Sequence, residues 1–562
     1  MRLLIVGGVA GGATAAARAR RLDEKAEIIL FERGEYISFA NCGLPYYVGG
    51  VIPERGNLLV TTAAAFQQRY DIDVRPFSQV TAIDRKAKTV TVTDLAKGAT
   101  YTEAYDKLIL APGAEPVKPK LPGSDLERIF SLRNLDDVDR IKAYVDKAHP
   151  LAAVVIGGGF IGLEMVENLV HRGLKVTVVE MLDQVMAPLD FEMAGLVHAE
   201  LRRMGVELRL GEGVEAFETI DDRIAVKTSK RHNINADLVI MAVGIRPENE
   251  LAKAAGLDLC ERGHIKVNAA LATSDPDIYA VGDAVCLPDI VSGSLVNTAL
   301  AGPANKQARI AADNAVGRRA VYRGTLGSSI AKVFGLSVGG TGLNEKRLRS
   351  LNIPYLVSYT HSAAHATYYP GAEQLAIKLL FAPGTGRLLG AQVVGGAGAD
   401  KRIDVLATAI KAGLTVFDLE ELELAYAPPY SSAKDPVNIA GFVAANILKG
   451  DVEHLTWNQL KDLGGDDVLL DVRGEDEARM AGSLNGSKLL PLPELRARLN
   501  ELDHSKTYVV YCAVGLRGYL ACRILKQHGF KAKNLSGGYR TYLGAQEKIM
   551  HEAGFERLWQ SE

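Results

Sequence analysis

The chain has 562 residues, a formal net charge of −2, 48% hydrophobic residues and 23% charged residues. This length predicts roughly three to four domains, and the composition is typical of a globular protein. A net charge near zero gives no general attraction for a polyanion, so we expect no nucleic-acid partner.

The five cysteines are too few and too scattered for a disulfide scaffold: Cys42, Cys260, Cys286, Cys512 and Cys522. No two of them form a CxxC pair, so we expect no thiolate metal site. This cysteine usage favours a reducing, cytoplasmic compartment.

The N-terminus, basic at its ends and apolar between, superficially resembles a signal peptide. Leu3–Val6 followed by the glycine-rich stretch 7–12 is better interpreted as a strand, a glycine turn and a helix. The longest apolar run, Leu151–Leu163, contains glycines and is too short to span a bilayer. We therefore expect no membrane partner.

The same pattern occurs twice, over Leu3–Glu32 and over Val154–Glu180. Each copy contains an apolar strand, a glycine turn, a helix and a second strand that ends in a glutamate. Two copies with an acid at the right distance are typical of two dinucleotide-binding βαβ units.

The second unit matches the dinucleotide fingerprint fully, with Gly157, Gly159 and Gly162. Glycines in such a turn let the backbone approach a pyrophosphate, whose charge lies at a helix N-terminus.

The first unit departs from the fingerprint in one place. Gly7 and Gly12 match, but Val9 replaces the middle glycine. Gly8 and Gly11 are expected to supply the backbone freedom instead.

Glu32 and Glu180 end the second strands of their units. A carboxylate there accepts hydrogen bonds from ribose hydroxyls and repels a 2′-phosphate. One site therefore suits FAD and the other favours NADH, with NADPH left open as an alternative.

Further apolar strands that end in glycine occur at 108–113, 238–244 and 278–283. Their order predicts one nucleotide domain (1–120 and 250–322) with a second one (121–249) inserted in it. A strand-and-helix region without a glycine fingerprint follows at 323–447. A separate α/β domain is expected at 452–562.

The first four-fifths of the chain resemble the pyridine nucleotide–disulfide oxidoreductases, and within them the coenzyme A-disulfide reductase group. Residues 273–284 are similar to the second FAD motif of that family. The resemblance implies an α/β fold class with two Rossmann-like domains, which bind FAD and NAD(P)H, and an α+β dimerisation domain at 323–447. It also implies a homodimer.

By the same resemblance, Asp283 binds the ribityl chain of the flavin, and a helix starting near Ala299 lies beneath the isoalloxazine. The other cofactor contacts that we expect are Arg33, Ser38, Asn41, Ala111, Pro112, Gly113, Phe160, Ile161, Gly244, Gly282, Gly302 and Ala304.

The segment Ser38–Tyr47 contains the candidate redox residue, Cys42. A dithiol relative would carry a second cysteine five residues later, where this chain has Tyr47. Cys42 is therefore expected to cycle through a mixed disulfide, a persulfide or a sulfenic acid. Its thiolate would be favoured by a helix N-terminus or a positive neighbour.

No C-terminal His–Glu acid/base pair is found. Coenzyme A-disulfide reductases are thought to use two tyrosines from the partner subunit near the cysteine sulfur. Tyr368 and Tyr426 match them best, with Tyr369 and Tyr430 as rivals. A phenol can donate a hydrogen bond to a leaving sulfur.

Coenzyme A carries phosphates, so its site needs cations or helix N-termini. The resemblance points to Ser38 and Asn41 and to four further substrate contacts: Thr14, Arg18, Arg21 and Lys434. A solvated basic helix face is the alternative explanation for the arginines.

The segment Cys512–Arg517 lies between a predicted strand and a predicted helix, and its backbone N–H groups would surround the sulfur. With 471–473 upstream and 535–539 downstream, it resembles a single rhodanese domain. Arg517 is expected to contact the substrate. Gly482-Ser483 departs from the family, which usually has Gly-His there.

The predicted function is that of an FAD-dependent enzyme that uses NAD(P)H to reduce coenzyme A disulfide, coenzyme A persulfide or polysulfide at Cys42. The rhodanese domain would carry sulfane sulfur on Cys512. Two alternatives stay open: an NADH oxidase or peroxidase with a sulfenic acid at Cys42, and a non-catalytic FAD-binding sulfur carrier or redox sensor.

Overall fold

The computed structural model describes residues 1–552 and the side chains through Ile549, so the last ten residues of the expected 452–562 domain lie outside the description. Two compact units are present. The first comprises Met1–Val179 and Glu212–Gly327; the second comprises Glu180–Gly211 and the chain from Ser328 onward. Among the described residues, none of the helices is long and apolar enough to cross a membrane.

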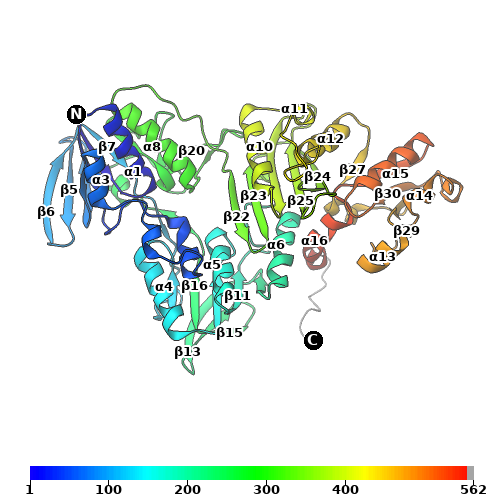
Figure 1. Ribbon diagram of the computed structural model, residues 1–562, viewed down its shortest axis with the longest axis horizontal. Coiled ribbons are helices and arrows are strands. Elements are labelled where there is room, and N and C mark those ends of the chain that lie inside the picture. Colours follow the sequence, from blue (N-terminus) through cyan, green and yellow to red (C-terminus); the bar gives the residue numbers. More distant parts are fainter. Residues whose placement is uncertain (553–562) are drawn as a thin grey trace. The chain divides into compact units, whose positions relative to one another are not determined.

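The first unit contains a five-stranded parallel sheet in the order β19-β7-β1-β2-β3, with α1 and α8 packed against it (Figure 1). Leu3, Leu4 and Ile5 of β1 are fully buried, as expected for a strand covered on both faces. The elements are β1 (Arg2–Val6), α1 (Ala10–Leu22), β2 (Glu27–Phe31), η1 (Asn41–Gly43), α2 (Leu44–Val48), η2 (Arg55–Leu58), α3 (Ala63–Tyr70), β3 (Asp73–Arg75), β7 (Lys107–Leu110), α7 (Glu250–Ala254), β19 (Ile278–Ala280), η3 (Gly282–Ala284) and α8 (Ala301–Ala315).

A second parallel sheet in the same unit repeats this arrangement, with neighbouring strands β11-β10-β16-β9. Its helix α4 begins at a capping box between Asn134 and Asp137, which satisfies the first free N–H groups of the helix. The elements are β9 (Ile129–Ser131), α4 (Leu135–Ala148), β10 (Ala152–Ile156), α5 (Phe160–His171), β11 (Lys175–Glu180) and β16 (Leu238–Met241).

Small antiparallel sheets complete the first unit, in the orders β4-β5-β6, β13-β14-β15 and β17-β8, beside the short sheet β18-β20-β21. Their strands are β4 (Ser78–Asp84), β5 (Thr89–Asp94), β6 (Ala99–Ala104), β8 (Ala114–Pro116), β13 (Val214–Ile220), β14 (Arg223–Thr228), β15 (Asn233–Ala236), β17 (Ile245–Pro247), β18 (Ile265–Lys266), β20 (Val285–Pro288) and β21 (Leu295–Val296).

The second unit contains an antiparallel sheet in the order β22-β23-β26-β25-β24, against which α10 and α12 pack (Figure 1). The elements are α6 (Phe191–Arg203), β12 (Glu207–Leu210), β22 (Ser329–Val333), β23 (Leu336–Gly342), α9 (Glu345–Ser350), β24 (Leu356–Ala363), β25 (Gln374–Phe381), β26 (Leu388–Gly395), α10 (Ala399–Ala412), α11 (Val416–Glu421) and α12 (Pro436–Leu448).

The C-terminal part of the second unit is built on a parallel sheet in the order β27-β31-β30-β28-β29. The elements are β27 (Glu453–Leu455), η4 (Trp457–Asp462), β28 (Asp467–Asp471), α13 (Glu475–Ala481), β29 (Lys488–Leu489), α14 (Leu492–Leu495), η5 (Leu499–Glu501), β30 (Thr507–Tyr511), α15 (Leu516–Gln527), β31 (Lys531–Leu535) and α16 (Gly538–Glu552). The predicted α/β fold class is confirmed.

Inside the second unit, β24 contacts this C-terminal part directly. The backbone N–H of Tyr359 donates to the Ser536 hydroxyl over 3.2 Å, and the His361 ring lies 2.8 Å from the Thr541 hydroxyl. The antiparallel sheet and the C-terminal parallel sheet of this unit are therefore joined by polar contacts of side chains and backbone as well as by the chain itself.

Candidate functional site

Both glycine turns contain positions where no other residue fits. Gly7 has φ +97°, and a Cβ there would lie 2.2 Å from the Ala111 carbonyl oxygen. A Cβ at Gly12 would lie 1.7 Å from the carbonyl oxygen of Gly7. In the second turn, Gly157 and Gly162 make the same close approaches, at 2.3 Å and 2.0 Å from carbonyl oxygens. Gly7 and Gly157 thus let each turn approach the end of a neighbouring strand, at Ala111 after β7 and Ala242 after β16, and Gly12 and Gly162 let each helix pack against its own turn.

Other glycines of these sheets face open space. A Cβ at Gly159, Gly113 or Gly244 would meet nothing within 4 Å. Gly159 is also the N-cap of α5, so the open space lies where a helix N-terminus favours negative charge. This geometry fits the approach of a dinucleotide backbone to the turn.

The two strand-end glutamates are held by backbone N–H groups. The Glu32 carboxylate accepts from Gly8 and Gly34, each over 2.8 Å, and the Glu180 carboxylate accepts from Leu182 over 2.8 Å. Backbone donors thus orient both acids at the ends of β2 and β11.

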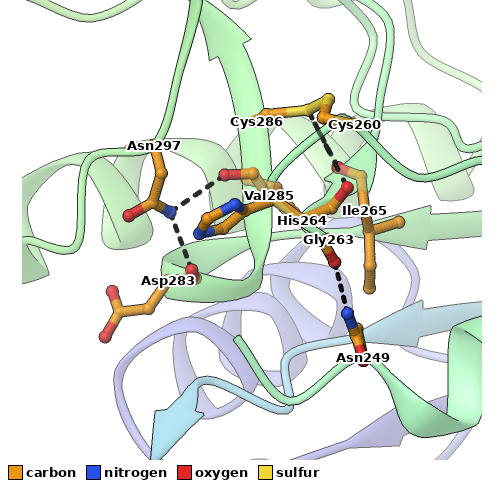
Figure 2. The surroundings of a disulfide bond; sticks show 9 residues. All are labelled: Asn249, Cys260, Gly263, His264, Ile265, Asp283, Val285, Cys286 and Asn297. Carbon is orange, nitrogen blue, oxygen red and sulfur yellow. Dashed lines mark hydrogen bonds between the residues drawn. A yellow bond between two sulfur atoms is a disulfide. The ribbon is translucent and has the colours of Figure 1, made fainter. Parts of the chain in front are cut away.

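Asp283 lies in η3, directly after β19. Burial raises the pKa of its carboxyl group, which has no hydrogen-bond partner among the described residues. Figure 2 shows Asn297 bracing the loop: its amide donates to the carbonyl oxygens of Asp283 (2.7 Å) and Val285 (3.1 Å). The buried Gln307 accepts from the Gly282 N–H over 2.8 Å. The sequence analysis did not identify Asn297 and Gln307, because both lie in later segments and contact the Asp283 loop only in the folded structure.

The remaining predicted cofactor residues cluster at strand ends and helix starts. Ala111 and Pro112 follow β7, Phe160 and Ile161 begin α5, and Ala299, Gly302 and Ala304 lie at the start of α8; Gly11 lies in α1, Ser38 precedes η1, and Asn41 begins it. Arg33 is paired with Glu248 over 2.6 Å, and the same carboxylate also contacts Arg133, so two arginines share one negative charge.

A disulfide joins Cys260 to Cys286, a pairing that the sequence analysis did not predict (Figure 2). Cys286 lies in β20, immediately after η3. The bond therefore ties the 258–266 hairpin to the strand that follows Asp283.

Cys42 lies in η1, just before α2, and is exposed. The pKa of its thiol is raised, first by partial burial and then by the negative charges of Glu164 and Asp283. The expected positive neighbour is thus not found among the groups that shift this pKa, and the local protein charge opposes the thiolate.

Tyr47 occupies the place of a second redox cysteine, and the ammonium of Lys142 lies 5.1 Å from the centre of its ring. Among the described cysteines, Cys42, Cys512 and Cys522 are free thiols. Cys42 therefore has no sulfur partner within its own segment.

In the second unit, the hydroxyl oxygens of Tyr368 and Tyr426 lie 2.8 Å apart, and both side chains are exposed. The rivals Tyr369 and Tyr430 are exposed too. The structure thus pairs the two tyrosines that were preferred from the sequence.

The predicted substrate contacts on α1 are partly engaged. The Thr14 hydroxyl donates to Asn305 over 2.6 Å, and Arg18 forms an ion pair with Asp313 over 2.7 Å. Arg21 and, in the second unit, Lys434 are exposed. Because Asp313 compensates Arg18, a phosphate would have to compete for that guanidinium.

The Cys512 sulfur is fully buried at the end of β30, and the Gly515 N–H points at it over 3.2 Å. Arg517 at the start of α15 forms a bidentate pair with Glu477, at 2.7 Å and 2.6 Å. This pair raises the pKa of Arg517, and the Cys512 sulfur adds to the shift. Glu477 is a site residue that the sequence analysis missed.

Ser483 stands where the rhodanese family usually has a histidine. Its side chain belongs to a buried hydrogen-bond network and does not hydrogen-bond to the Cys512 sulfur. Its hydroxyl lies 3.0 Å from Arg473 and 3.2 Å from Asp471. Arg473 in turn lies between the rings of Tyr511 and Tyr539, at 5.5 Å and 4.6 Å. Ser483 therefore helps to hold the loop before β29.

One unexpected cluster of three buried acids lies in the second unit. Asp190, Glu192 and Glu345 bring their oxygens close enough together to hold a cation. The buried ammonium of Lys378 already contacts all three, at 2.8 Å from Asp190 and 2.5 Å from Glu345. The lysine thus supplies the positive charge at this position.

Comparison with known proteins places these parts in known families. Residues 1–308 match the model of the pyridine nucleotide-disulphide oxidoreductases, residues 328–436 match the dimerisation domain of that family, and residues 456–545 match the rhodanese-like domain. The coenzyme A disulfide reductase of Staphylococcus haemolyticus is 36% identical over 447 residues, which are 79% of this chain and all of that protein.

Two solved structures are similar over nearly the whole chain. The reduced CoADR-RHD of Bacillus anthracis is 50% identical with a TM-score of 0.94, covering 97% of this chain and 98% of the other. The NAD-dependent persulfide reductase from A. fulgidus is 40% identical with a TM-score of 0.91, covering 96% and 100%. The water-forming NADH oxidase from Lactobacillus brevis is 28% identical with a TM-score of 0.77, covering 80% of this chain and 99% of its own.

Proposed function

The chain belongs to the pyridine nucleotide-disulphide oxidoreductases, and from this premise we propose that it is an FAD-dependent enzyme that uses NADH to reduce coenzyme A disulfide or coenzyme A persulfide at Cys42. The observation that carries the proposal is a lone, exposed redox cysteine in the same unit as two dinucleotide turns, with Tyr47 in place of a second cysteine.

The flavin would be held by the first turn and by the loop around Asp283. The open space at Gly113 and the carboxylate of Asp283, which has no hydrogen-bond partner within residues 1–549, fit a ligand with a diphosphate and hydroxyl groups. Once bound, it would accept a hydride from NADH and pass two electrons to a sulfur–sulfur bond. NADH would lie on the second turn, with Glu180 at its ribose.

Cys42 would attack the substrate disulfide as a thiolate. The sulfur–sulfur bond of the substrate breaks. One of its sulfurs forms a mixed disulfide with Cys42, and the other leaves as a thiolate. We propose that Tyr368 and Tyr426, acting from the partner subunit of a homodimer, donate hydrogen bonds to the leaving sulfur. Thr14, Arg18, Arg21, Ser38, Asn41 and Lys434 are proposed to hold coenzyme A.

The second centre is Cys512, which would carry sulfane sulfur as a persulfide. A buried sulfur that receives a backbone N–H and lies beside the Arg517 guanidinium is suited to an anionic sulfur chain. Residues Cys512 and Arg517 therefore form the proposed sulfur-transfer site. Coenzyme A persulfide would carry sulfur between the two centres, in the cytoplasm.

An NADH oxidase is the second candidate, because the Lactobacillus brevis oxidase shares the fold of the first four-fifths of the chain. The oxidase covers 80% of this chain and has no counterpart of the rhodanese-like part, which favours a sulfur substrate over oxygen. Anaerobic NADH consumption with coenzyme A disulfide, compared with consumption on oxygen or peroxide alone, tests the choice. Turnover on oxygen or peroxide without any on disulfide or persulfide would refute the proposed function.

A further inference from the structure

The disulfide between Cys260 and Cys286 joins a hairpin to the strand that follows the Asp283 loop (Figure 2). Cys260 begins the turn of this hairpin: its N–H donates to the His264 carbonyl oxygen over 2.7 Å, and its carbonyl oxygen accepts from Gly263 over 2.8 Å. The second arm of the hairpin, β18, pairs in parallel with β20, the strand that contains Cys286. The bond therefore connects the turn of the hairpin to the strand beside its other arm.

This hairpin lies between two parts of the proposed flavin site. On one side, β20 follows directly after η3, which contains Asp283. On the other side, the Gly263 carbonyl oxygen accepts from the Asn249 amide over 2.6 Å. The residue before Asn249 is Glu248, whose N–H donates to the Gly113 carbonyl oxygen over 3.0 Å. A bond that fixes the hairpin therefore also restrains the positions of Asp283 and Gly113.

The two sulfurs differ in their access to solvent. Cys260 is half-buried and is followed by two exposed residues, whereas Cys286 is only 2% exposed. A small thiol or disulfide in solution therefore reaches the pair from the side of Cys260. The Cys286 sulfur lies 3.7 Å from the Ile265 carbonyl oxygen and 3.9 Å from that of His264, so its thiol has hydrogen-bond acceptors when the bond is reduced. Both states of the pair are thus compatible with the fold.

We propose that Cys260 and Cys286 are a reversible redox pair, which low-molecular-weight disulfides oxidise and which slows release of the flavin when it is oxidised. The choice of oxidant rests on the proposed function, because a disulfide substrate is the oxidant that this enzyme meets. In the reducing compartment proposed above, protein disulfides are usually transient or redox-sensing. Because a cross-link lowers the entropy gained when the segments it joins come apart, flavin should leave the oxidised form more slowly.

Oxidation of the pair takes two thiol–disulfide exchanges. Cys260 loses its proton to solvent and attacks one sulfur of the small disulfide, so that a mixed disulfide with Cys260 forms and the other half leaves as a thiolate. Cys286 then loses its proton to solvent and attacks the Cys260 sulfur, which forms the internal bond and releases the second half as a thiolate. Two cysteine thiols are thus oxidised while one disulfide is reduced to two thiols. Excess thiol in solution reverses both steps.

The first measurement follows the pair itself. The FAD-loaded enzyme is equilibrated in buffers with graded ratios of oxidised to reduced glutathione, quenched in acid and alkylated. Mass spectrometry then quantifies the peptides that contain Cys260 and Cys286 as linked or alkylated. We expect a reversible passage from alkylated to linked peptides as the share of oxidised glutathione rises. A pair that stays alkylated in every buffer, or linked in every buffer, would overturn the proposal.

The second measurement follows the flavin. Release of FAD, recorded by its fluorescence in solution, should be several-fold slower from oxidised wild type than from reduced wild type. Cys260→Ser should release FAD at the rate of reduced wild type in both buffers; because it retains Cys42, it separates any effect of glutathione on that residue. Cys522→Ala, which removes a free cysteine of the second unit, should respond as wild type does. Equal release from the two states of wild type would refute the role of the pair.

A further comparison covers the case in which Cys260→Ser does not bind FAD. Release is then compared between the oxidised and reduced states of Cys42→Ser, in which position 42 cannot react with glutathione. Slower release from the oxidised state supports the proposal, and equal release overturns it. None of these measurements needs turnover, so their outcomes are separate from failure of the disulfide reductase activity.

Discussion

The phenol oxygens of Tyr368 and Tyr426 lie 2.8 Å apart on the exposed surface of the second unit, and the hydrogen bond between the two hydroxyls raises the pKa of Tyr368. A raised pKa keeps the phenol protonated at neutral pH, so the pair retains a proton that it can donate. Two tyrosines that hold each other in place and face solvent are suited to a role in another subunit.

We expect Tyr426→Phe to lower kcat with coenzyme A disulfide by roughly 10²-fold, which is typical of removing one proton donor. The neighbouring Tyr369→Phe serves as the control and should retain activity. Co-expression of Tyr426→Phe with Cys42→Ser should restore activity, because one site of the mixed dimer would combine an intact cysteine with an intact tyrosine. A fully active monomer in sedimentation experiments would contradict this arrangement.

Cys42→Ser should bind FAD and undergo reduction by NADH as wild type does, because hydride transfer does not need the sulfur. Turnover with disulfide or persulfide should fall to background. Flavin absorbance under anaerobic NADH titration and steady-state NADH consumption are the two measurements. Substantial turnover in this variant would remove Cys42 from the reaction.

Glu180→Ala should narrow the preference for NADH over NADPH by about tenfold, or ~1.4 kcal/mol, because a strand-end carboxylate repels a 2′-phosphate. The ratio of the two kcat/KM values measures it. Glu32→Ala is the comparison: it should weaken FAD retention and leave the nucleotide ratio alone. A wild-type enzyme that already prefers NADPH would show that Glu180 has another role.

Cys512→Ser should spare the reduction of coenzyme A disulfide and impair the reduction of sulfur from a donor that must first load the rhodanese loop. Fusion of the two centres raises the effective concentration of one product at the other. Cys522→Ala, which removes a buried sulfur from the same core, controls for damage to the domain. Equal rates for wild type and Cys512→Ser across several sulfane donors, with and without coenzyme A, would exclude Cys512 from the path.

The burial of His361 should make the second unit acid-sensitive. Burial lowers the pKa of His361 from 6.5 to about 3, so in acid the unfolded state binds a proton that the folded state refuses. Stability should therefore fall as the pH drops below about 6.5. In His361→Gln, the pH-dependent change in the free energy of unfolding that comes from this histidine disappears. Thermal melts across that range should show the wild type losing a few degrees of Tm more than the variant; parallel losses would argue against it.

Much of this protein was predictable from local patterns. Continuous apolar runs before the glycines predicted parallel strands, and Gly7 and Gly157 are indeed positions where a side chain would strike a backbone oxygen. Those oxygens belong to Ala111 and Ala242, so the clash itself is not local, but the positive φ of each glycine is a local requirement that the tight turn imposes on the residue that forms it. For the same reason, Tyr47 was enough to predict that Cys42 has no sulfur partner nearby.

Local sequence patterns could not predict the charges and hydrogen bonds around these residues. The pairing of Cys260 with Cys286, the capture of Arg18 by Asp313 and the pairing of Arg517 with Glu477 all join residues far apart in sequence. The raised pKa of Cys42 has the same origin, because it depends on burial and on Glu164, more than a hundred residues away. The sequence by itself determined which residues can do the chemistry; folding decided their ionisation, because burial and through-space charge are properties of the packed structure.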